Sequence, residues 1–101
     1  MKLLTDELRA RLPRLYSQEG EADPPICAKF FLPGTNWTWY VIEGQEQEGD
    51  FLFFGFVVGM ESEFGYFLLS ELESVRSPFQ VERDLTFQPG RLTDVVPAPD
   101  S

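Results

Sequence analysis

Four of the five leucines in the first fifteen positions recur at intervals of three and four, which places these four on one face of a helix. They are Leu4, Leu8, Leu12 and Leu15. Thr5 followed by Asp6 and Glu7 is a typical helix start, because the hydroxyl can accept from free backbone amides and the acids favour the positive end of the helix dipole. Pro13 disfavours helical geometry at the residue before it, so we predict that the helix ends near Arg11.

From residue 26 onward the pattern changes to that of β-strands. Residues 26–32 predict a first strand, and turn-forming residues at 33–36 lead to a second strand at 37–43. Alternation places Trp37, Trp39 and Val41 on one face of that second strand. Residues 44–50 are polar and acidic and predict a loop, whereas residues 51–60 are apolar apart from two glycines, which favours a strand covered on both faces.

The remaining segments complete an α+β pattern. We expect a turn at 61–63, a fourth strand at 64–69 and a fifth strand at 80–87. Ser70 with Glu73 three residues later predicts a capping box for a short helix that ends near residue 75. The sequence therefore predicts one compact domain over residues 1–89, built from an antiparallel sheet of about five strands with an N-terminal helix and a short helix before the last strand. Prolines and glycine after residue 88 predict an irregular tail at 90–101, which we expect to be mobile.

Charge is strongly segregated along the chain. The net charge is −9, and no basic residue lies between Lys29 and Arg76, although eight acids do. Because acidic segments that are disordered are poor in aromatic residues, this aromatic span predicts a folded sheet with an anionic rim. Such a surface disfavours direct nucleic-acid binding, which depends on basic residues, and favours a protein partner with a basic surface.

Two sets of residues are candidates for binding. The first set is the acidic surface, formed by Glu46, Glu48, Asp50, Glu61, Glu63, Glu71 and Glu73. Pairs of acids two residues apart could also hold Mg²⁺ or Ca²⁺ when they share a strand face, or they could simply be solvated. The second, alternative set is an aromatic face formed by Asn36, Trp37, Trp39 and Tyr40. These aromatic rings could stack on single-stranded bases or pack in the core.

The sequence offers little support for catalysis. There is no histidine, so Ser-His and Cys-His pairs are impossible, and no glycine-rich loop precedes a helix. Cys27 is the only cysteine and we expect it to be a buried structural residue. We assign no catalytic residue, no metal site and no cofactor. The longest apolar run is too short for a membrane span, and we expect a cytoplasmic protein with no membrane partner.

Several short motifs occur together: WTWY at 37–40, DFLFFG at 50–55, GYF at 65–67, SELE at 70–73 and ERDL at 82–85. In this combination the chain resembles the bacterial domain-of-unknown-function family 2958 over about Leu3 to Pro89. The resemblance implies a small protein encoded on plasmids or other mobile elements, and it assigns no catalytic residue.

These observations together lead to a leading hypothesis. We predict a non-enzymatic acidic accessory protein of a mobile element that acts by protein–protein binding. One form of the hypothesis is a nucleic-acid-mimicking decoy against a host nucleic-acid-binding or defence protein. The alternatives are a single-stranded nucleic-acid-binding or metal-dependent processing protein, and a structural subunit without independent activity. The sequence does not determine the oligomeric state.

Overall fold

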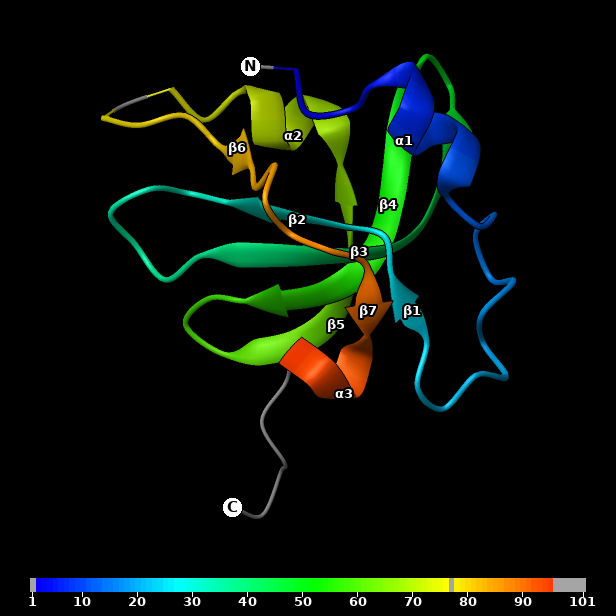
Figure 1. Ribbon diagram of the computed structural model, residues 1–101. Coiled ribbons are helices and arrows are strands. Elements are labelled where there is room, and N and C mark those ends of the chain that lie inside the picture. Colours follow the sequence, from blue (N-terminus) through cyan, green and yellow to red (C-terminus); the bar gives the residue numbers. More distant parts are fainter. Residues whose placement is uncertain (1, 77, 96–101) are drawn as a thin grey trace.

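The computed structural model describes residues 2–76 and 78–95. Its main feature is a five-stranded antiparallel sheet in the order β5-β4-β3-β2-β6, which confirms the predicted α+β fold. The strands of this sheet are β2 (Ala28–Phe31), β3 (Thr38–Gln47), β4 (Asp50–Val58), β5 (Ser62–Leu68) and β6 (Glu82–Arg83). The helices are α1 (Asp6–Arg11), α2 (Leu69–Glu73) and α3 (Leu92–Val95), and a small second sheet pairs β1 (Pro25–Ile26) with β7 (Gly90–Arg91). Figure 1 shows α1 and α2 at one end of the molecule and α3 at the other.

The N-terminal helix forms as predicted. The Thr5 hydroxyl accepts a hydrogen bond from the Leu8 amide at 3.2 Å, and the helix ends at Arg11. Leu8 is completely buried, because the leucine face of α1 lies on one face of the large sheet. This face carries a row of aromatic side chains, in which the Phe53 ring lies 5.5 Å from the ring of Phe30 and 5.4 Å from that of Phe67 between centroids.

The prediction that residues 51–60 form a strand covered on both faces is wrong. Along β4 the buried Phe51 and Phe53 alternate with the partly exposed Leu52, Phe54 and Phe56. The reason is that α1 and α2 both pack against the same face. The opposite face has only partial cover, which leaves aromatic side chains within reach of a partner.

The predicted loop at 44–50 is also wrong, because β3 and β4 form one long hairpin. β3 continues to Gln47, β4 begins at Asp50, and only Glu48 and Gly49 remain as the turn. Both turn residues have positive φ angles, +52° and +82°, as a two-residue hairpin turn that matches the strand twist requires. Pairing with the apolar β4 holds these polar residues in a strand, against their local preference.

Three further predictions need correction near the chain ends. The expected strand at 26–32 is interrupted at Cys27, where the chain leaves the small sheet and joins the large one. The expected strand at 80–87 is reduced to β6, because the Asp84 carboxylate accepts from the Thr86 amide at 2.9 Å and turns the chain. The expected irregular tail is wrong over residues 90–95, which form α3 and the strand β7 that pairs with β1, while residues 96–101 lie outside the described residues.

The predicted capping box is displaced by two residues. The helix starts at Leu69, and the Glu71 carboxylate, instead of that of Glu73, accepts from the backbone amide of Leu68 at 2.8 Å. The Ser70 hydroxyl donates to the Asp50 carboxylate, so it links α2 to the start of β4 and does not cap the helix. The short helix before β6 is nevertheless present as predicted.

Candidate functional site

Strand β4 divides the predicted acidic surface into two groups. Its nine residues separate the groups by roughly 25–30 Å along the strand. One group lies at the β3–β4 turn and α2 and consists of Glu46, Glu48, Asp50, Glu71 and Glu73. The other group lies at the opposite end of β4, with Glu61 in the β4–β5 turn and Glu63 at the start of β5.

The acids of the first group mostly have partners within the protein. Glu46 forms an ion pair with Arg9 of α1, and Glu71 caps α2. Asp50 accepts from the Ser70 hydroxyl and from the backbone amides of Phe51 and Ser70 at 2.8 and 3.2 Å. The Ser70 hydroxyl, followed by these amides, lowers the pKa of the Asp50 carboxyl. We conclude that this group contributes to the fold as well as to the surface charge.

Glu61 and Glu63 have a different environment, because they border a pocket that also contains Trp37 and Trp39. The two indole rings stack at 5.9 Å between centroids with an interplanar angle of 23°. Neither carboxylate forms an ion pair or side-chain hydrogen bond within the described part of the chain. The pocket has a volume of about 380 Å³. We call it the tryptophan pocket and define it by Trp37, Trp39, Val57, Met60, Glu61, Glu63, Phe64, Gly65, Tyr66 and Phe67.

Glycines shape the tryptophan pocket. A Cβ at Gly59 would lie 2.3 Å from the Trp37 ring, so this glycine lets the indole pack against the β4–β5 turn. Gly65 lines the pocket from β5, and a Cβ built there meets nothing within 4 Å. Trp37 is 37% exposed and Met60 is 94% exposed, so both are accessible from solvent. The pocket is therefore an open apolar surface with carboxylates at its border.

The other two residues of the predicted aromatic face lie elsewhere. Tyr40 points to the opposite face of the sheet, where its ring lies 6.3 Å from the Phe87 ring and 6.0 Å from the Lys29 ammonium group. The Asn36 side-chain amide donates to the Gly59 carbonyl at 3.3 Å and so connects the two loops beneath Trp37. The structure thus brings the two tryptophans together with Glu61 and Glu63 instead of with Tyr40.

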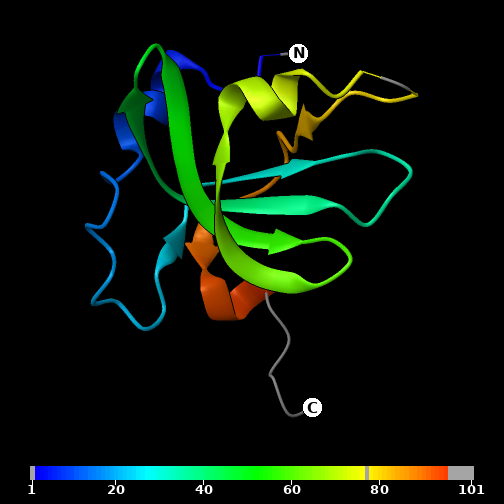
Figure 2. The same cartoon turned by 180° about the vertical axis from the view of Figure 1, so that it is seen from behind.

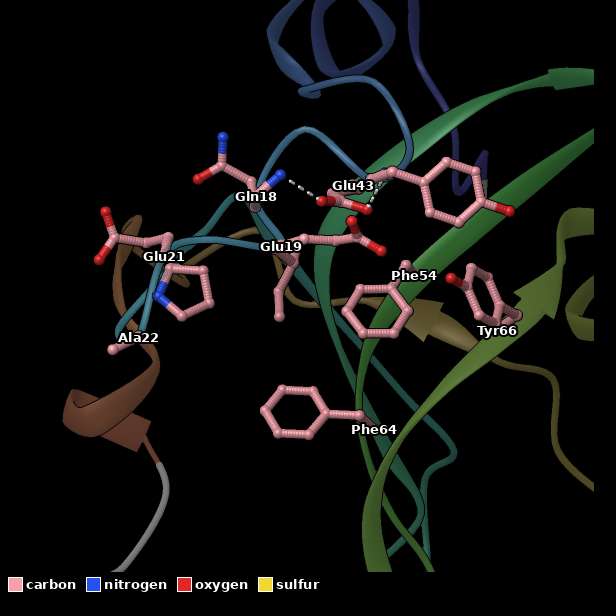
Figure 3. Close-up of a pocket in the computed structure, with 11 residues that line it drawn as sticks. Gln18, Glu19, Glu21, Ala22, Glu43, Phe54, Phe64 and Tyr66 are labelled. Carbon is pink, nitrogen blue, oxygen red and sulfur yellow. Dashed lines mark hydrogen bonds between the residues drawn. The ribbon is translucent and has the colours of Figure 1, made fainter.

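A second pocket lies on the opposite face of the sheet, and the sequence analysis missed it. It has a volume of about 450 Å³. Figure 3 shows Phe54, Phe64 and Tyr66 projecting from the strands toward the loop that carries Gln18 and Glu19. We call it the tyrosine pocket and define it by Tyr16, Gln18, Glu19, Glu21, Ala22, Pro24, Ile42, Glu43, Phe54, Phe64 and Tyr66.

Glu43 fixes the loop that forms one wall of the tyrosine pocket. It is only 2% exposed, and its two carboxylate oxygens accept from the backbone amides of Tyr16 at 2.8 Å and Gln18 at 2.7 Å. These hydrogen bonds hold Tyr16 at a φ angle of +70°, which non-glycine residues rarely adopt. The Tyr16 ring then lies 6.3 Å from that of Tyr66. Glu43, the last residue of the strand predicted at 37–43, is therefore a buried anchor for a distant loop.

The electrostatics of the tyrosine pocket favour the neutral form of Tyr66. Partial desolvation, followed by Tyr16 and the carboxylates of Glu43 and Glu19, raises the pKa of Tyr66. Tyr66 therefore keeps its hydroxyl proton at neutral pH and can donate a hydrogen bond. The carboxylates of this pocket come from the loop before β1 and from β3 and do not suit phosphate groups, whereas its β5 wall consists of the aromatic side chains of Phe64 and Tyr66.

The described residues show no site for metal or thiol chemistry. Residues 2–76 and 78–95 contain no group of three or more potential metal ligands. Cys27 is partly buried, and burial raises the pKa of its thiol, so the reactive thiolate form is disfavoured. The described helices contain four to six residues, fewer than a membrane-spanning helix requires.

Comparison with known proteins places the chain in a family. The model of the family described as "Protein of unknown function (DUF2958)" matches residues 3–96, so the chain belongs to this family. The match includes the segment after Pro89 that the sequence analysis had left outside the resemblance. Neither a curated protein nor a solved structure matches the chain.

Proposed function

We propose that this member of the DUF2958 family is a non-enzymatic accessory protein that binds a partner protein through a basic surface of that partner. The observation that carries the proposal is the tryptophan pocket, where Glu61 and Glu63 lack ion-pair partners within the described residues and lie beside the exposed indole of Trp37 and the partly buried indole of Trp39. Carboxylates and indole faces both attract ammonium and guanidinium groups. A lysine or arginine side chain of the partner would satisfy both kinds of group at once.

In this proposal the protein is encoded on a mobile element and acts in the bacterial cytoplasm. There the protein would occupy the basic surface of a host nucleic-acid-binding or defence protein and act as a decoy. The net charge of −9 supports this idea, because a strongly negative field accelerates encounter with a positive surface. In this proposal the acids at the β3–β4 turn contribute to the long-range field, and the tryptophan pocket makes the close contacts.

One observation favours the alternative function, in which the protein binds single-stranded nucleic acid. Trp37 and Trp39 stack on each other, and Trp37 is exposed, as base-stacking residues are. However, Glu61 and Glu63 at the same pocket would repel phosphates, and none of the described residues that line the pocket is basic. A fluorescence titration of the protein with single-stranded DNA tests this alternative directly.

The experiment compares two variants that remove the same charge from opposite ends of β4. Glu61→Gln/Glu63→Gln alters the tryptophan pocket, and Glu46→Gln/Glu48→Gln is the matched control at the β3–β4 turn. Tagged wild-type protein is used to capture basic proteins from a bacterial lysate, and mass spectrometry identifies them. The association rate of the purified partner with each variant is then measured at several salt concentrations.

We expect the wild-type association rate to fall as salt rises, because the screening length shortens to about 8 Å at physiological ionic strength. The complex should dissociate much faster with the pocket variant than with the control. The proposal would be contradicted if the rates of partner binding changed neither with salt nor with either variant. Saturable binding of single-stranded DNA would favour the alternative function.

A further inference from the structure

Strand β5 has a free edge that lies between the two pockets. Within the described residues β5 pairs with β4 alone, and Figure 2 shows it running from the β4–β5 turn up to α2. Soluble proteins usually protect such edges with lysine, proline or a very short strand. β5 is seven residues long and contains neither lysine nor proline, and Glu63 is its only charged residue. The opposite edge strand, β6, has only two residues.

The hydrogen-bond pattern identifies which β5 residues present their backbone to a partner. The Gly44 amide donates to the Pro13 carbonyl at 2.9 Å, so Gly44 is turned away from its β4 partner Phe53. Phe53 therefore directs its amide and carbonyl toward its β5 partner Phe67. Since orientation alternates along a strand, Phe64 and Tyr66 direct their backbone groups outward. The Leu68 amide has the same orientation, and it donates to the Glu71 carboxylate instead of to β4.

The two faces of this edge differ in chemistry. Glu63 and Gly65 border the tryptophan pocket, where carboxylates lie beside indole rings. Phe64 and Tyr66 point to the tyrosine pocket, and about half of each side chain is exposed, 50% and 51%. A strand added beside β5 would place its alternate side chains next to these two different surfaces.

We infer that an extended segment of the partner adds to β5 as an antiparallel strand, with basic side chains over the tryptophan pocket and apolar side chains over Phe64 and Tyr66. This inference rests on the proposed function and specifies its binding mode. Backbone hydrogen bonds to Phe64 and Tyr66 supply affinity, and the two pockets select an alternating basic and apolar sequence. A second copy of this chain is a poor occupant, because two chains of charge −9 repel each other and would bring their Glu63 side chains together.

The geometry of antiparallel pairing makes the inference specific. Residues directly opposite each other point to the same face and either exchange two hydrogen bonds or none. Partner residues opposite Phe64 and Tyr66 therefore donate their amides to β5 and carry the apolar side chains. The amides of the basic residues point away from β5 and need no partner on this protein.

Four synthetic peptides of equal length and charge test the inference by fluorescence anisotropy. The first alternates arginine and valine over six residues, and the second has the same composition in two blocks, three arginines followed by three valines. The third and fourth are alternating peptides that are N-methylated on the valines or on the arginines. N-methylation removes the amide donor and leaves the charge unchanged.

We expect the alternating peptide to bind about tenfold more tightly than the block peptide, and methylated valines to weaken binding by about tenfold or more, because each lost hydrogen bond can weaken affinity up to about tenfold. Methylated arginines should weaken binding by less than about threefold, since those amides point away from β5. Gly65→Val fills the space where a Cβ meets no atom, and it should weaken binding of the alternating peptide without lowering stability.

Equal binding of the two methylated peptides would overturn strand addition, as would failure of the alternating peptide to bind. A concentration-dependent dimer in sedimentation that masks the peptide site would also overturn it, because a second copy would then occupy β5. The proposed function has a separate readout: a captured partner whose salt-dependent association requires Glu61 and Glu63 would support it even when strand addition fails.

Discussion

The acidic residues near the two ends of β4 differ in whether they have partners within the protein. At the β3–β4 end, Asp50 accepts three hydrogen bonds and Glu46 pairs with Arg9. At the β4–β5 end, Glu61 and Glu63 lie beside tryptophan rings without such partners in the described residues. The comparison teaches that an acid's role depends on whether the fold supplies donors to it. Acids without internal donors are the better candidates for binding another molecule.

The largest expected effect comes from the core that holds both ends in place. Phe53 is completely buried in the row of aromatic rings beneath α1 and α2. Phe53→Ala should lower the free energy of unfolding by about 3–5 kcal/mol, because it removes a buried aromatic ring and leaves a cavity. Urea denaturation measures this change. Phe64→Ala is the control, and its half-exposed side chain should cost about 1 kcal/mol or less. Equal effects of the two substitutions would contradict the assignment of the covered face.

The second prediction extends the comparison to the buried acid Glu43. Glu43→Ala leaves the amides of Tyr16 and Gln18 without their acceptors and should lower the free energy of unfolding by about 2–4 kcal/mol. Glu63→Ala, at an exposed position without an ion-pair partner among the described residues, should change the free energy of unfolding by less than about 0.5 kcal/mol. Thermal unfolding of both variants measures the difference. Glu43→Gln keeps one acceptor, so its loss of unfolding free energy should lie between those of the two alanine variants. A Glu43→Ala protein as stable as wild type would show that Glu43 does not anchor the loop.

The third and smallest effect concerns the pH dependence that Asp50 confers. Its hydrogen bonds lower its pKa in the folded protein below the usual value of about 4. The resulting stabilisation is therefore present above the unfolded-state pKa and is lost as the pH falls through the lower, folded-state pKa. Asp50→Asn should unfold at a lower urea concentration than wild type at neutral pH. The difference between the two urea midpoints should become smaller at acid pH. A difference in urea midpoint that stays constant from neutral to acid pH would show that the Asp50 charge does not stabilise the contact with α2.

The predictable parts of the fold are those in which local signals and packing agree. Thr5 and the leucine spacing predicted α1 because the cap and the buried face lie within one short segment. Alternation likewise placed Trp37 and Trp39 on one face, where their rings stack. The hairpin at 44–50 could not be predicted in this way, because Gln45 and Gln47 are held in a strand by pairing with Leu52 and Asp50.

The candidate site was predictable only in part, for a related reason. Glu61 and Glu63 were identified from charge, and the two tryptophans from alternation. The two glutamates and the two tryptophans form one pocket because the β4–β5 hairpin folds back beside the loop before β3. The sequence alone does not show this contact. The tyrosine pocket depends on contacts between residues 16–18 and Glu43, which are more than twenty positions apart. A buried acid with two backbone donors has no local sequence signal.

The most direct test of the central claim is the dissociation constant of the alternating arginine–valine peptide for two variants of equal net charge, measured at physiological ionic strength, where the screening length is about 8 Å. Glu61→Gln/Glu63→Gln should weaken binding by about tenfold or more, which corresponds to the loss of about 1.4 kcal/mol. Glu46→Gln/Glu48→Gln should weaken it by less than about threefold, because exposed charges farther away than the screening length contribute little. Equal weakening by both variants, or a larger effect at the β3–β4 turn, would contradict the claim that the binding acids are those beside the tryptophans.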